Sequence, residues 1–293
     1  MKSKKNKDPK YGFFTADPIP TKEEVDAFYE KEFYDSNSKY FNNSSLLIQE
    51  QQSDFFNSRW EKIYDFSKSF FKSELLNKKV FDIGFGFAQA LIYFKNKGLK
   101  VSGLEPSNEG VKYAKDQGIK NAYQCSIENL EEVKDKHDIV LLLNVLEHLR
   151  DPKKVLLDIK SNVLNEKGLL IIDVPNDFND FQIVANNEYD LNEWWFYPPN
   201  HINYFSHDSL KSLLKGCGYN IEYCTSSFPL DIFLLFGDQY VGNPELGREC
   251  HNKRVNFERL MVKHNKKEKL NTFYESLAKL NLGRSISIYA TPI

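Results

Sequence analysis

The stretch KVFDIGFGFAQALI, from Lys79 to Ile92, contains a short apolar run that ends in Asp-x-Gly-x-Gly and continues into an amphipathic segment. The apolar run predicts a buried strand, and the residues after it predict a helix. Glycines at such a junction let a nucleotide or nucleoside approach the backbone, because no Cβ is in the way. The stretch therefore predicts a cofactor-binding loop.

The spacing of the glycines distinguishes two classes of cofactor. A dinucleotide loop has the pattern Gly-x-Gly-x-x-Gly, with the third glycine beneath a pyrophosphate. Counted from Gly84 and Gly86, that third position is Gln89. A nucleoside cofactor without phosphate fits better, because Asp82 precedes the loop and its carboxylate would favour an ammonium or sulfonium group. Glu105 ends the next apolar segment, where an acidic side chain can accept both ribose hydroxyls.

Short apolar segments alternate with amphipathic segments from Lys79 to Thr225. This alternation is typical of a parallel sheet with crossover helices. The expected strands are Lys79–Ile83, Lys100–Leu104, Asn121–Cys125, Asp138–Leu143, Leu169–Val174 and Asn220–Cys224. The expected helices are Ala88–Lys97, Ser107–Asp116, Pro152–Leu164 and Ser206–Lys215.

The remaining sequence divides into segments around this core. Residues 1–10 are basic and are expected to form a mobile tail, whereas residues 11–75 are rich in aromatic residues and are expected to form a helical N-terminal extension or lid. Residues 76–225 form the cofactor-binding core. Within it, residues 176–205 are expected to be a long aromatic loop on the substrate side, because α/β folds place substrate pockets after their strands.

The C-terminal part is expected to add a helical insertion and one more strand. The insertion spans residues 226–283 and is predicted to be helical from Val255 to Leu280. Residues 284–293 alternate between apolar and polar side chains, as an edge strand does, and would return to the sheet beside Asn220–Cys224.

Composition indicates a folded protein without a general attraction for polyanions. The chain has 293 residues, of which 41% are hydrophobic and 14% aromatic. These fractions argue for a folded protein. The net charge of −2 gives no global attraction for nucleic acid or for an anionic membrane surface.

Cellular location is also indicated by the sequence. No apolar run is long enough to span a bilayer, and the basic start lacks the apolar core of a signal peptide. The four cysteines are scattered, without the spacing of a metal site, which is typical of free thiols in a reducing compartment. We therefore expect a cytoplasmic protein.

Five blocks of the sequence resemble class I S-adenosylmethionine-dependent methyltransferases in order and spacing. The resemblance covers residues 55–225 and is greatest to the branch that includes ubiquinone-biosynthesis-type and sugar or glycan O-methyltransferases. It implies a Rossmann-like α/β fold, a mostly parallel seven-stranded sheet flanked by helices, with a reversed last hairpin that Ser285–Ala290 would complete. The blocks are FDIGFGFAQ, VSGLEPS, HDIVLLLNVLEHLRDPKKVL, NEKGLLIIDVPN and HINYFSHDSLKSLLKGCGYNIEY.

This resemblance implies S-adenosyl-L-methionine as the cofactor and S-adenosyl-L-homocysteine as the product. By resemblance, the loop residues line the methionine end of the cofactor, Glu105 binds the ribose, Ser126 and Ile127 flank the adenine, and Asn144 faces the cofactor. Two residues depart from the family pattern, Ala88 and Phe85. The bulky side chain of Phe85 would narrow the cofactor pocket. The expected cofactor-binding residues are Asp82, Gly84, Phe85, Gly86, Glu105, Ser126, Ile127 and Asn144.

Two histidines are candidates for the chemistry. A hydroxyl acceptor must lose a proton, and histidine titrates in the range suited to removing it. His148 follows the fourth expected strand and His201 ends the aromatic loop, but either can equally be a structural residue. Glu147 is a candidate to orient a histidine. Related quinone methyltransferases carry a further Glu where this chain has Asn144, so we expect no metal.

Aromatic residues in two segments are candidates to enclose an acceptor. Packing in the core is an equal alternative for each of them. A wall that stacks on a ring or sugar face is expected from Trp194, Trp195, Phe196 and Tyr197. A lid that excludes water is expected from Tyr29, Tyr34, Tyr40 and Trp60.

The sequence thus predicts methyl transfer to a hydroxyl, or with less support an amine, of a small molecule. The start DPIPTKEEVDAFYEKEFYD resembles the lead-in of several surface-glycan methyltransferases, which favours a sugar or sugar-nucleotide acceptor. The alternatives are a quinone or phenol O-methyltransferase and a non-catalytic cofactor-binding subunit, with a dinucleotide-dependent redox enzyme last. The C-terminal edge strand and the 226–283 insertion leave room for a homodimer.

Overall fold

The computed structural model describes residues 4–28 and 53–293, which fall into two compact units. Unit 1 comprises Met1–Asn42, Val174–Ser212 and Cys224–Ser287. Unit 2 comprises Asn43–Asp173, Leu213–Tyr223 and Ile288–Ile293. Tyr29, Tyr34 and Tyr40, three of the four residues expected in a lid, lie outside the described residues.

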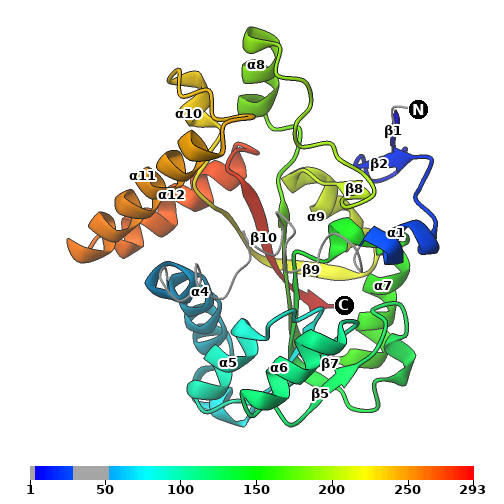
Figure 1. Ribbon diagram of the computed structural model, residues 1–293. Coiled ribbons are helices and arrows are strands. Elements are labelled where there is room, and N and C mark those ends of the chain that lie inside the picture. The colour runs from blue at the N-terminus through cyan, green and yellow to red at the C-terminus, as the bar shows by residue number, and fades with distance from the viewer. Residues whose placement is uncertain (1–3, 29–52) are drawn as a thin grey trace. The chain divides into compact units, whose positions relative to one another are not determined.

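A seven-stranded sheet has the order β5-β4-β3-β6-β7-β10-β9 (Figure 1). Strand β3 pairs in parallel with β4 and β6, β4 with β5, and β6 with β7. The last strand, β10, lies between β7 and β9, so the final two strands are in reversed order. The strands are β3 (Lys79–Ile83), β4 (Lys100–Glu105), β5 (Ala122–Gln124), β6 (His137–Leu143), β7 (Leu164–Pro175), β9 (Tyr219–Ser226) and β10 (Ser285–Pro292). The predicted α/β fold is confirmed.

Helices follow the strands of unit 2 as the sequence predicts. Ser107 caps α6 by accepting a hydrogen bond from the N–H of Gly110, and Asp151 caps α7 by accepting one from Lys154. The predicted helix 152–164 ends as a π-helical turn, η5. The elements are α4 (Ser53–Phe71), η2 (Lys72–Asn77), α5 (Gln89–Asn96), α6 (Asn108–Asp116), η3 (Leu130–Glu132), η4 (Leu146–His148), α7 (Pro152–Asp158), η5 (Ile159–Val163) and α9 (His207–Gly216), the last of which is shared by both units.

The core of unit 2 forms on the central strands. These strands are apolar at successive positions because helices cover both faces of a parallel sheet. Val80, Ile139, Leu141, Leu169 and Ile171 are at most 1% exposed. The sheet therefore supplies a rigid base for the loops at its carboxyl edge.

Helix α4 packs on the sheet through aromatic side chains. The ring of Phe66 lies 4.5 Å from that of Tyr289 on β10 and 5.1 Å from that of Tyr223 on β9. Trp60 is only 7% exposed and belongs to the core, so the structure places this expected lid residue in the packing of α4. Aromatic contacts of this kind add to the free energy gained by burial of the rings.

The basic start of the chain is ordered, so the predicted mobile tail of residues 1–10 is wrong for the described residues 4–10. Strand β1 pairs antiparallel with β2, which in turn pairs with β8. The ammonium group of Lys5 lies 4.3 Å from the ring centre of Phe178 and forms an ion pair with Glu193, which explains how a lysine-rich segment is held. The elements are β1 (Lys4–Lys7), β2 (Phe14–Asp17), β8 (Asn203–Tyr204) and α1 (Lys22–Phe28).

Unit 1 has more regular structure than the sequence predicts. The segment 176–205, expected as one long loop, contains helix α8 and strand β8. The single helix expected from Val255 to Leu280 is two helices, because Asn265 adopts a left-handed φ of 58° that ends α11. Helices α11 and α12 lie side by side (Figure 1), with the Tyr274 hydroxyl donating to Glu258 over 2.8 Å. The helices are α8 (Asp180–Tyr189), α10 (Ile232–Leu235), α11 (Pro244–Lys263) and α12 (Lys267–Lys279).

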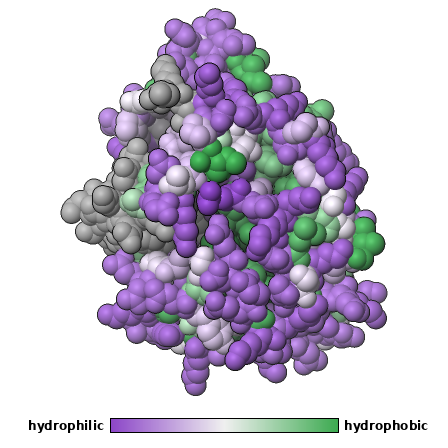
Figure 2. All heavy atoms as spheres, turned by 90° about the vertical axis from the view of Figure 1, so that its right-hand side faces the viewer, coloured by the Kyte–Doolittle hydropathy of each residue, from purple (hydrophilic) through white to green (hydrophobic). Residues whose placement is uncertain are grey.

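The face drawn in Figure 2 is mostly hydrophilic and carries hydrophobic residues only in small groups. Scattered apolar residues of this kind are normal on a protein surface. Within residues 4–28 and 53–293, no helix combines the length and the hydropathy needed to cross a membrane.

The close packing of β4 against the glycine loop can be tested by substitution of Gly103. A Cβ at this position would lie 2.5 Å from the carbonyl oxygen of Asp82 and 2.8 Å from Cδ1 of Phe85. We expect Gly103→Ala to lower the free energy of unfolding by about 1–3 kcal/mol, because the neighbouring backbone must move. Urea denaturation measures this change.

The matched control is Gly247→Ala, in helix α11. A Cβ there would meet no atom within 4 Å, and alanine favours the helix over glycine. The control should be as stable as the wild type or more stable. Equal stability of Gly103→Ala and the wild type would show that β4 can shift without cost.

Candidate functional site

The glycine loop joins β3 to α5 in unit 2. Gly84 and Gly86 have φ values of 71° and 52°, which favour glycine. A Cβ on Gly84 would lie 2.8 Å from Cγ2 of Val145 and 3.2 Å from Cδ1 of Ile127, whereas a Cβ on Gly86 would meet nothing within 4 Å. The loop is therefore tightly packed at Gly84 and has open space beside Gly86, where a ligand can approach the backbone.

The two departures from the expected loop pattern are accommodated in different ways. Ala88 caps α5 with a φ of 53° and is fully buried. The ring of Phe85 is 7% exposed and packs in the core of unit 2, against Gly103. Because this ring is held in the core, it is not placed to narrow the pocket as the sequence suggested.

Glu105 fixes the geometry of the loop. Its side chain is buried, with Oε2 accepting from the N–H of Gly86 and Oε1 from the N–H of Ser107, each over 2.9 Å. Hydrogen bonds to a charged carboxylate are strong, so these two bonds hold the side chain at the edge of the loop. The arrangement fits a carboxylate that also accepts hydrogen bonds from two ribose hydroxyls.

Asp82 is a second buried acid at the same edge of the sheet. Burial, and then the neighbouring Glu105, raise the pKa of Asp82 well above its ordinary value of 3.8, while Arg59 acts in the opposite direction. Two acids this close favour a ligand with positive charge, since a cation offsets the cost of ionising both. The ammonium and sulfonium groups expected from the sequence meet this requirement.

Arg59, on helix α4, was not identified from the sequence. Its Nη2 lies 3.1 Å from Oδ1 of Asp173, at the end of β7, and its charge also acts on Asp82. One signal was present, because Arg59 is a basic residue within an aromatic run, DFFNSRW. Its pairing with Asp173 depends on the packing of α4, which the sequence pattern does not specify.

The other expected cofactor residues lie at the carboxyl ends of the neighbouring strands. Ser126 and Ile127 follow β5 and are half-buried. Asn144 follows β6 with a φ of 57°, is exposed, and donates its backbone N–H to the carbonyl of Asp173 over 2.7 Å. Parallel α/β sheets place ligands at this edge. Unit 2 thus brings all the expected cofactor residues to one edge.

The candidate catalytic residues are divided between the units. Glu147 and His148 are adjacent in η4 of unit 2, where Glu147 is buried and its Oε1 lies 3.7 Å from Nε2 of His148. His201 belongs to unit 1, where its Nε2 lies 3.2 Å from the hydroxyl of Tyr197. The Tyr204 hydroxyl donates to the carbonyl of His201 over 2.8 Å and so holds the backbone of this pair.

The aromatic run before His201 is only partly available for a ligand. Trp195 is 2% exposed and packs edge-on against Phe178, with ring centres 5.5 Å apart. Tyr197 is 38% exposed, and its ring centre lies 4.7 Å from that of His201. Of the expected wall, Tyr197 is therefore the residue best placed to stack on an acceptor.

A family model described as a methyltransferase domain matches residues 53–223, more than half of the chain. The chain belongs to this methyltransferase family. Its cofactor is S-adenosyl-L-methionine. None of the curated proteins matches this methyltransferase.

Two solved structures are similar to this chain at low sequence identity, and one of them is a methyltransferase. The plantazolicin methyltransferase BamL, solved with a triazolic desmethylPZN analog and SAH, is 16% identical, with a TM-score of 0.52 over 92% of this chain and 97% of that chain. The PH0226 protein from Pyrococcus horikoshii OT3 is 13% identical, with a TM-score of 0.49 over 91% and 99% of the two chains. At these identities the likeness concerns the fold alone.

The residues of unit 2 fit the cofactor. Asp82 and Glu105 are buried acids at the end of adjacent strands, and Gly86 leaves the backbone open beside them. Glu105 would hold the ribose, Asp82 the methionine end, and Ser126 with Ile127 the adenine. Bound S-adenosyl-L-methionine supplies an electrophilic methyl group on a sulfonium.

Replacement of Glu105 by glutamine tests the ribose contact. The amide of Glu105→Gln places a donor opposite one of the two backbone N–H groups and removes the charge. Because hydrogen bonds to a charged group contribute about 1.5–3 kcal/mol, we expect affinity for S-adenosyl-L-homocysteine to fall by about 10–100-fold in calorimetric titration. Glu109→Gln, exposed on α6, is the matched control and should bind as the wild type does. Unchanged affinity in Glu105→Gln would contradict the assignment.

The pKa of Asp82 gives a pH dependence to cofactor binding. Since this pKa is raised, the folded protein without ligand holds a proton that the unfolded chain releases, and its stability falls as the pH rises above about 4. A bound cation favours the ionised carboxylate, so affinity for S-adenosyl-L-methionine should rise with pH over the same range. We expect this rise to be absent in Asp82→Asn, as measured by calorimetry at several pH values. The same slope in both proteins would exclude Asp82 as its source.

Proposed function

We propose that this methyltransferase transfers the methyl group to a hydroxyl of a sugar or sugar nucleotide. The proposal rests above all on the pair formed by His201 and Tyr197 in unit 1, whose side chains are 3.2 Å apart. An alcohol must lose its proton during methylation, and a histidine within reach of a hydroxyl can take that proton. The exposed ring of Tyr197 gives a sugar face a surface on which to stack.

Two further observations support a sugar rather than a quinone or phenol. The lead-in DPIPTKEEVDAFYEKEFYD resembles that of surface-glycan methyltransferases. In addition, unit 1 contains buried charged residues, among them Asp177 and Asp231, which would be costly to place against an apolar ring. A polyhydroxylated acceptor offers hydrogen bonds to such groups.

We assign the following roles to the residues of this chain. Asp82, Glu105 and Arg59 position the cofactor in unit 2, and the acceptor is recognised by unit 1. We assign the general base to His201, with Tyr197 holding its ring. His148, oriented by Glu147, is the other candidate for the base. Most of the remaining rate enhancement would come from alignment of the acceptor oxygen with the methyl group.

We also propose that the reaction takes place in the cytoplasm. The cysteines in the described part of the chain, Cys125, Cys217, Cys224 and Cys250, are free thiols. Free thiols persist in reducing compartments.

Transfer of a labelled methyl group tests the function. The protein is incubated with methyl-labelled S-adenosyl-L-methionine and three acceptor sets: nucleotide sugars with methyl glycosides, catechols, and primary amines. We expect mass spectrometry to find label on a sugar hydroxyl. Label on catechols or amines alone would refute the sugar proposal, and cofactor binding without any transfer would favour a non-catalytic subunit.

Substitution of the histidines tests the assigned base. We expect His201→Asn to lower turnover by about 100-fold or more, because general base catalysis contributes at least that much, while affinity for S-adenosyl-L-homocysteine stays the same. His264→Asn, an exposed histidine after α11, is the control. If His148→Asn lowers turnover and His201→Asn does not, we would assign the general base to His148. Unchanged turnover in both variants would show that neither histidine takes part in the mechanism.

A further inference from the structure

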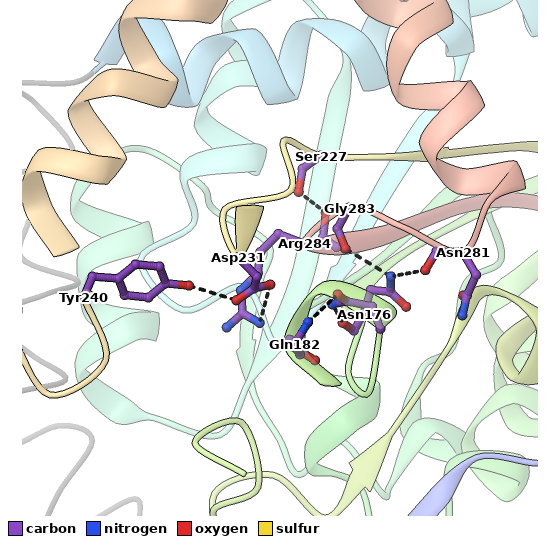
Figure 3. A network of polar contacts seen from close by, with 10 residues as sticks. Asn176, Gln182, Ser227, Asp231, Tyr240, Asn281, Gly283 and Arg284 are labelled. Atoms are coloured by element: carbon purple, nitrogen blue, oxygen red, sulfur yellow. Dashed lines mark hydrogen bonds and ion pairs between the residues drawn. The ribbon is translucent and has the colours of Figure 1, made fainter. Parts of the chain in front are cut away.

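Six polar residues gather in unit 1 near the start of β10, and five of them are labelled in Figure 3. They come from five separate segments: the end of β7, helix α8, the turn before α10, the loop after α10, and the residue before β10. Four of the six are at most 3% exposed. We call them the Asp231 cluster: Asn176, Asp177, Gln182, Asp231, Tyr240 and Arg284.

The framework of the cluster is held by specific hydrogen bonds. The backbone N–H of Asn176 donates to the carbonyl of Arg284 over 3.0 Å, and its side-chain amide donates to the carbonyls of Asn281 and Gly283 (Figure 3). The Tyr240 hydroxyl donates to Oδ1 of Asp231 over 2.8 Å. These bonds fix the positions of the segments, so the cluster is preorganised.

Several buried atoms of this framework have no hydrogen-bond partner among the described residues. Gln182 is fully buried, yet neither its amide oxygen nor its amide nitrogen is paired. Nη1 of Arg284 and Oδ2 of Asp231 are 3.8 Å apart, beyond hydrogen-bond distance. Nearly all buried polar atoms in folded proteins have a partner in the protein, in ordered water or in a ligand, so several atoms without a protein partner in one place mark a position where such a partner can bind. The atoms without a hydrogen-bond partner are Oδ1 of Asn176, Oδ2 of Asp177, Oε1 and Nε2 of Gln182, and Oδ2 of Asp231 and Nη1 of Arg284, which form a long ion pair with each other.

The chemistry of these atoms restricts the ligand. Most of them are acceptors, and the donors among them are on Gln182 and Arg284. A phosphate, which only accepts, would be opposed by the carboxylates of Asp177 and Asp231. An ammonium group, which only donates, would leave the donors of Arg284 and Gln182 unpaired. A hydroxyl both donates and accepts, so adjacent hydroxyls on one ring can satisfy both kinds of atom.

The protonation of Asp177 is also compatible with a ligand that carries hydroxyls. Burial raises the pKa of Asp177 to about 7, with Arg284 acting against the rise and Asp231 adding to it. Near neutral pH this carboxyl is therefore present in both forms, and it can donate to or accept from a hydroxyl.

The cluster and the assigned base both belong to unit 1. The charge of Arg284 interacts with the hydroxyl of Tyr197, and that of Asp177 with the hydroxyl of Tyr204. Tyr197 lies against the ring of His201, and Tyr204 holds its backbone. The cluster and the His201 and Tyr197 pair therefore belong to one unit and are coupled electrostatically.

We propose that the Asp231 cluster binds vicinal hydroxyls of the acceptor sugar and is therefore a substrate-recognition site. This proposal rests on the function proposed above. Gln182, Asp231 and Arg284 act as specificity-determining residues in it. They hold the hydroxyls that are not methylated and leave the reacting hydroxyl to His201.

Gln182→Leu separates recognition from folding. Leucine has a size similar to that of glutamine and removes both amide atoms that lack a hydrogen-bond partner. In the absence of ligand, Gln182→Leu should therefore be as stable as the wild type or more stable. If the amide binds hydroxyls, affinity for a sugar probe should fall at least tenfold. Asp231→Asn is the second variant, because asparagine can still accept from Tyr240 but opposes Arg284 with a donor. Glu188→Gln, exposed on the same helix as Gln182, is the control.

The probes are UDP-glucose, UDP-galactose, UDP-N-acetylglucosamine and the corresponding methyl glycosides, each titrated in the presence of S-adenosyl-L-homocysteine and followed by ligand-observed NMR. We expect wild type and Glu188→Gln to bind at least one probe equally, and both cluster variants to bind it at least tenfold more weakly. Affinity for S-adenosyl-L-homocysteine should be the same in all four proteins. Thermal unfolding without ligand should show no loss of stability in Gln182→Leu.

Each other outcome overturns the proposal. If both variants bind and methylate sugars as the wild type does, the cluster is structural while sugar methylation stands. If no probe binds the wild type and label appears only on catechols or amines, both the cluster and the sugar function are wrong. If Gln182→Leu is destabilised and its sugar affinity is unchanged, the amide serves the fold rather than a ligand.

Discussion

The carboxylate of Glu105 is the contact on which the cofactor site depends. It joins the end of β4 to the N–H groups of Gly86 and Ser107, and so fixes the glycine loop and the start of α6 together. Gly110 completes this arrangement, because a Cβ there would lie 2.6 Å from the carbonyl oxygen of Gly86. A single buried carboxylate thus fixes the loop and pairs with the neighbouring backbone, at the residue that we expect to hold the ribose. Its desolvation is offset by these hydrogen bonds.

Both units contain buried charged side chains. In unit 2 burial, and then the charge of Glu105, raise the pKa of Asp82, and Arg59 counters this rise only in part. In unit 1 Asp177 and Asp231 face the guanidinium of Arg284, whose side chain is 34% exposed and therefore partly screened by water. Such groups lower stability unless a ligand pairs with them, which is the usual cost of a binding site. The charges of unit 2 suit a cationic cofactor, and those of unit 1 are the ones that we propose for a hydroxylated acceptor.

The expected strands all exist in the structure, within one or two residues at most ends, because buried parallel strands are marked by local apolar runs. One long helical segment and one strand were harder to predict. The helix expected from Val255 to Leu280 breaks at Asn265, which adopts a left-handed φ of 58°. Asparagine can adopt this conformation, but it is a weaker signal of a helix end in the sequence than glycine is. Likewise β1 could not be expected from a lysine-rich segment, since its order comes from pairing with β2 and from the contact of Lys5 with Phe178.

The sequence by itself determined the α/β fold, the glycine loop and the two acids beside it, because these features depend on short local patterns. The tertiary structure decided where the ring of Phe85 points, how Arg59 pairs with Asp173, and which polar residues gather around Arg284. These outcomes depend on contacts between segments far apart in the chain, such as the bond from Asn176 to Gly283 across 107 residues. Local propensity carries no information on such contacts, since they form only when the core has brought the segments together.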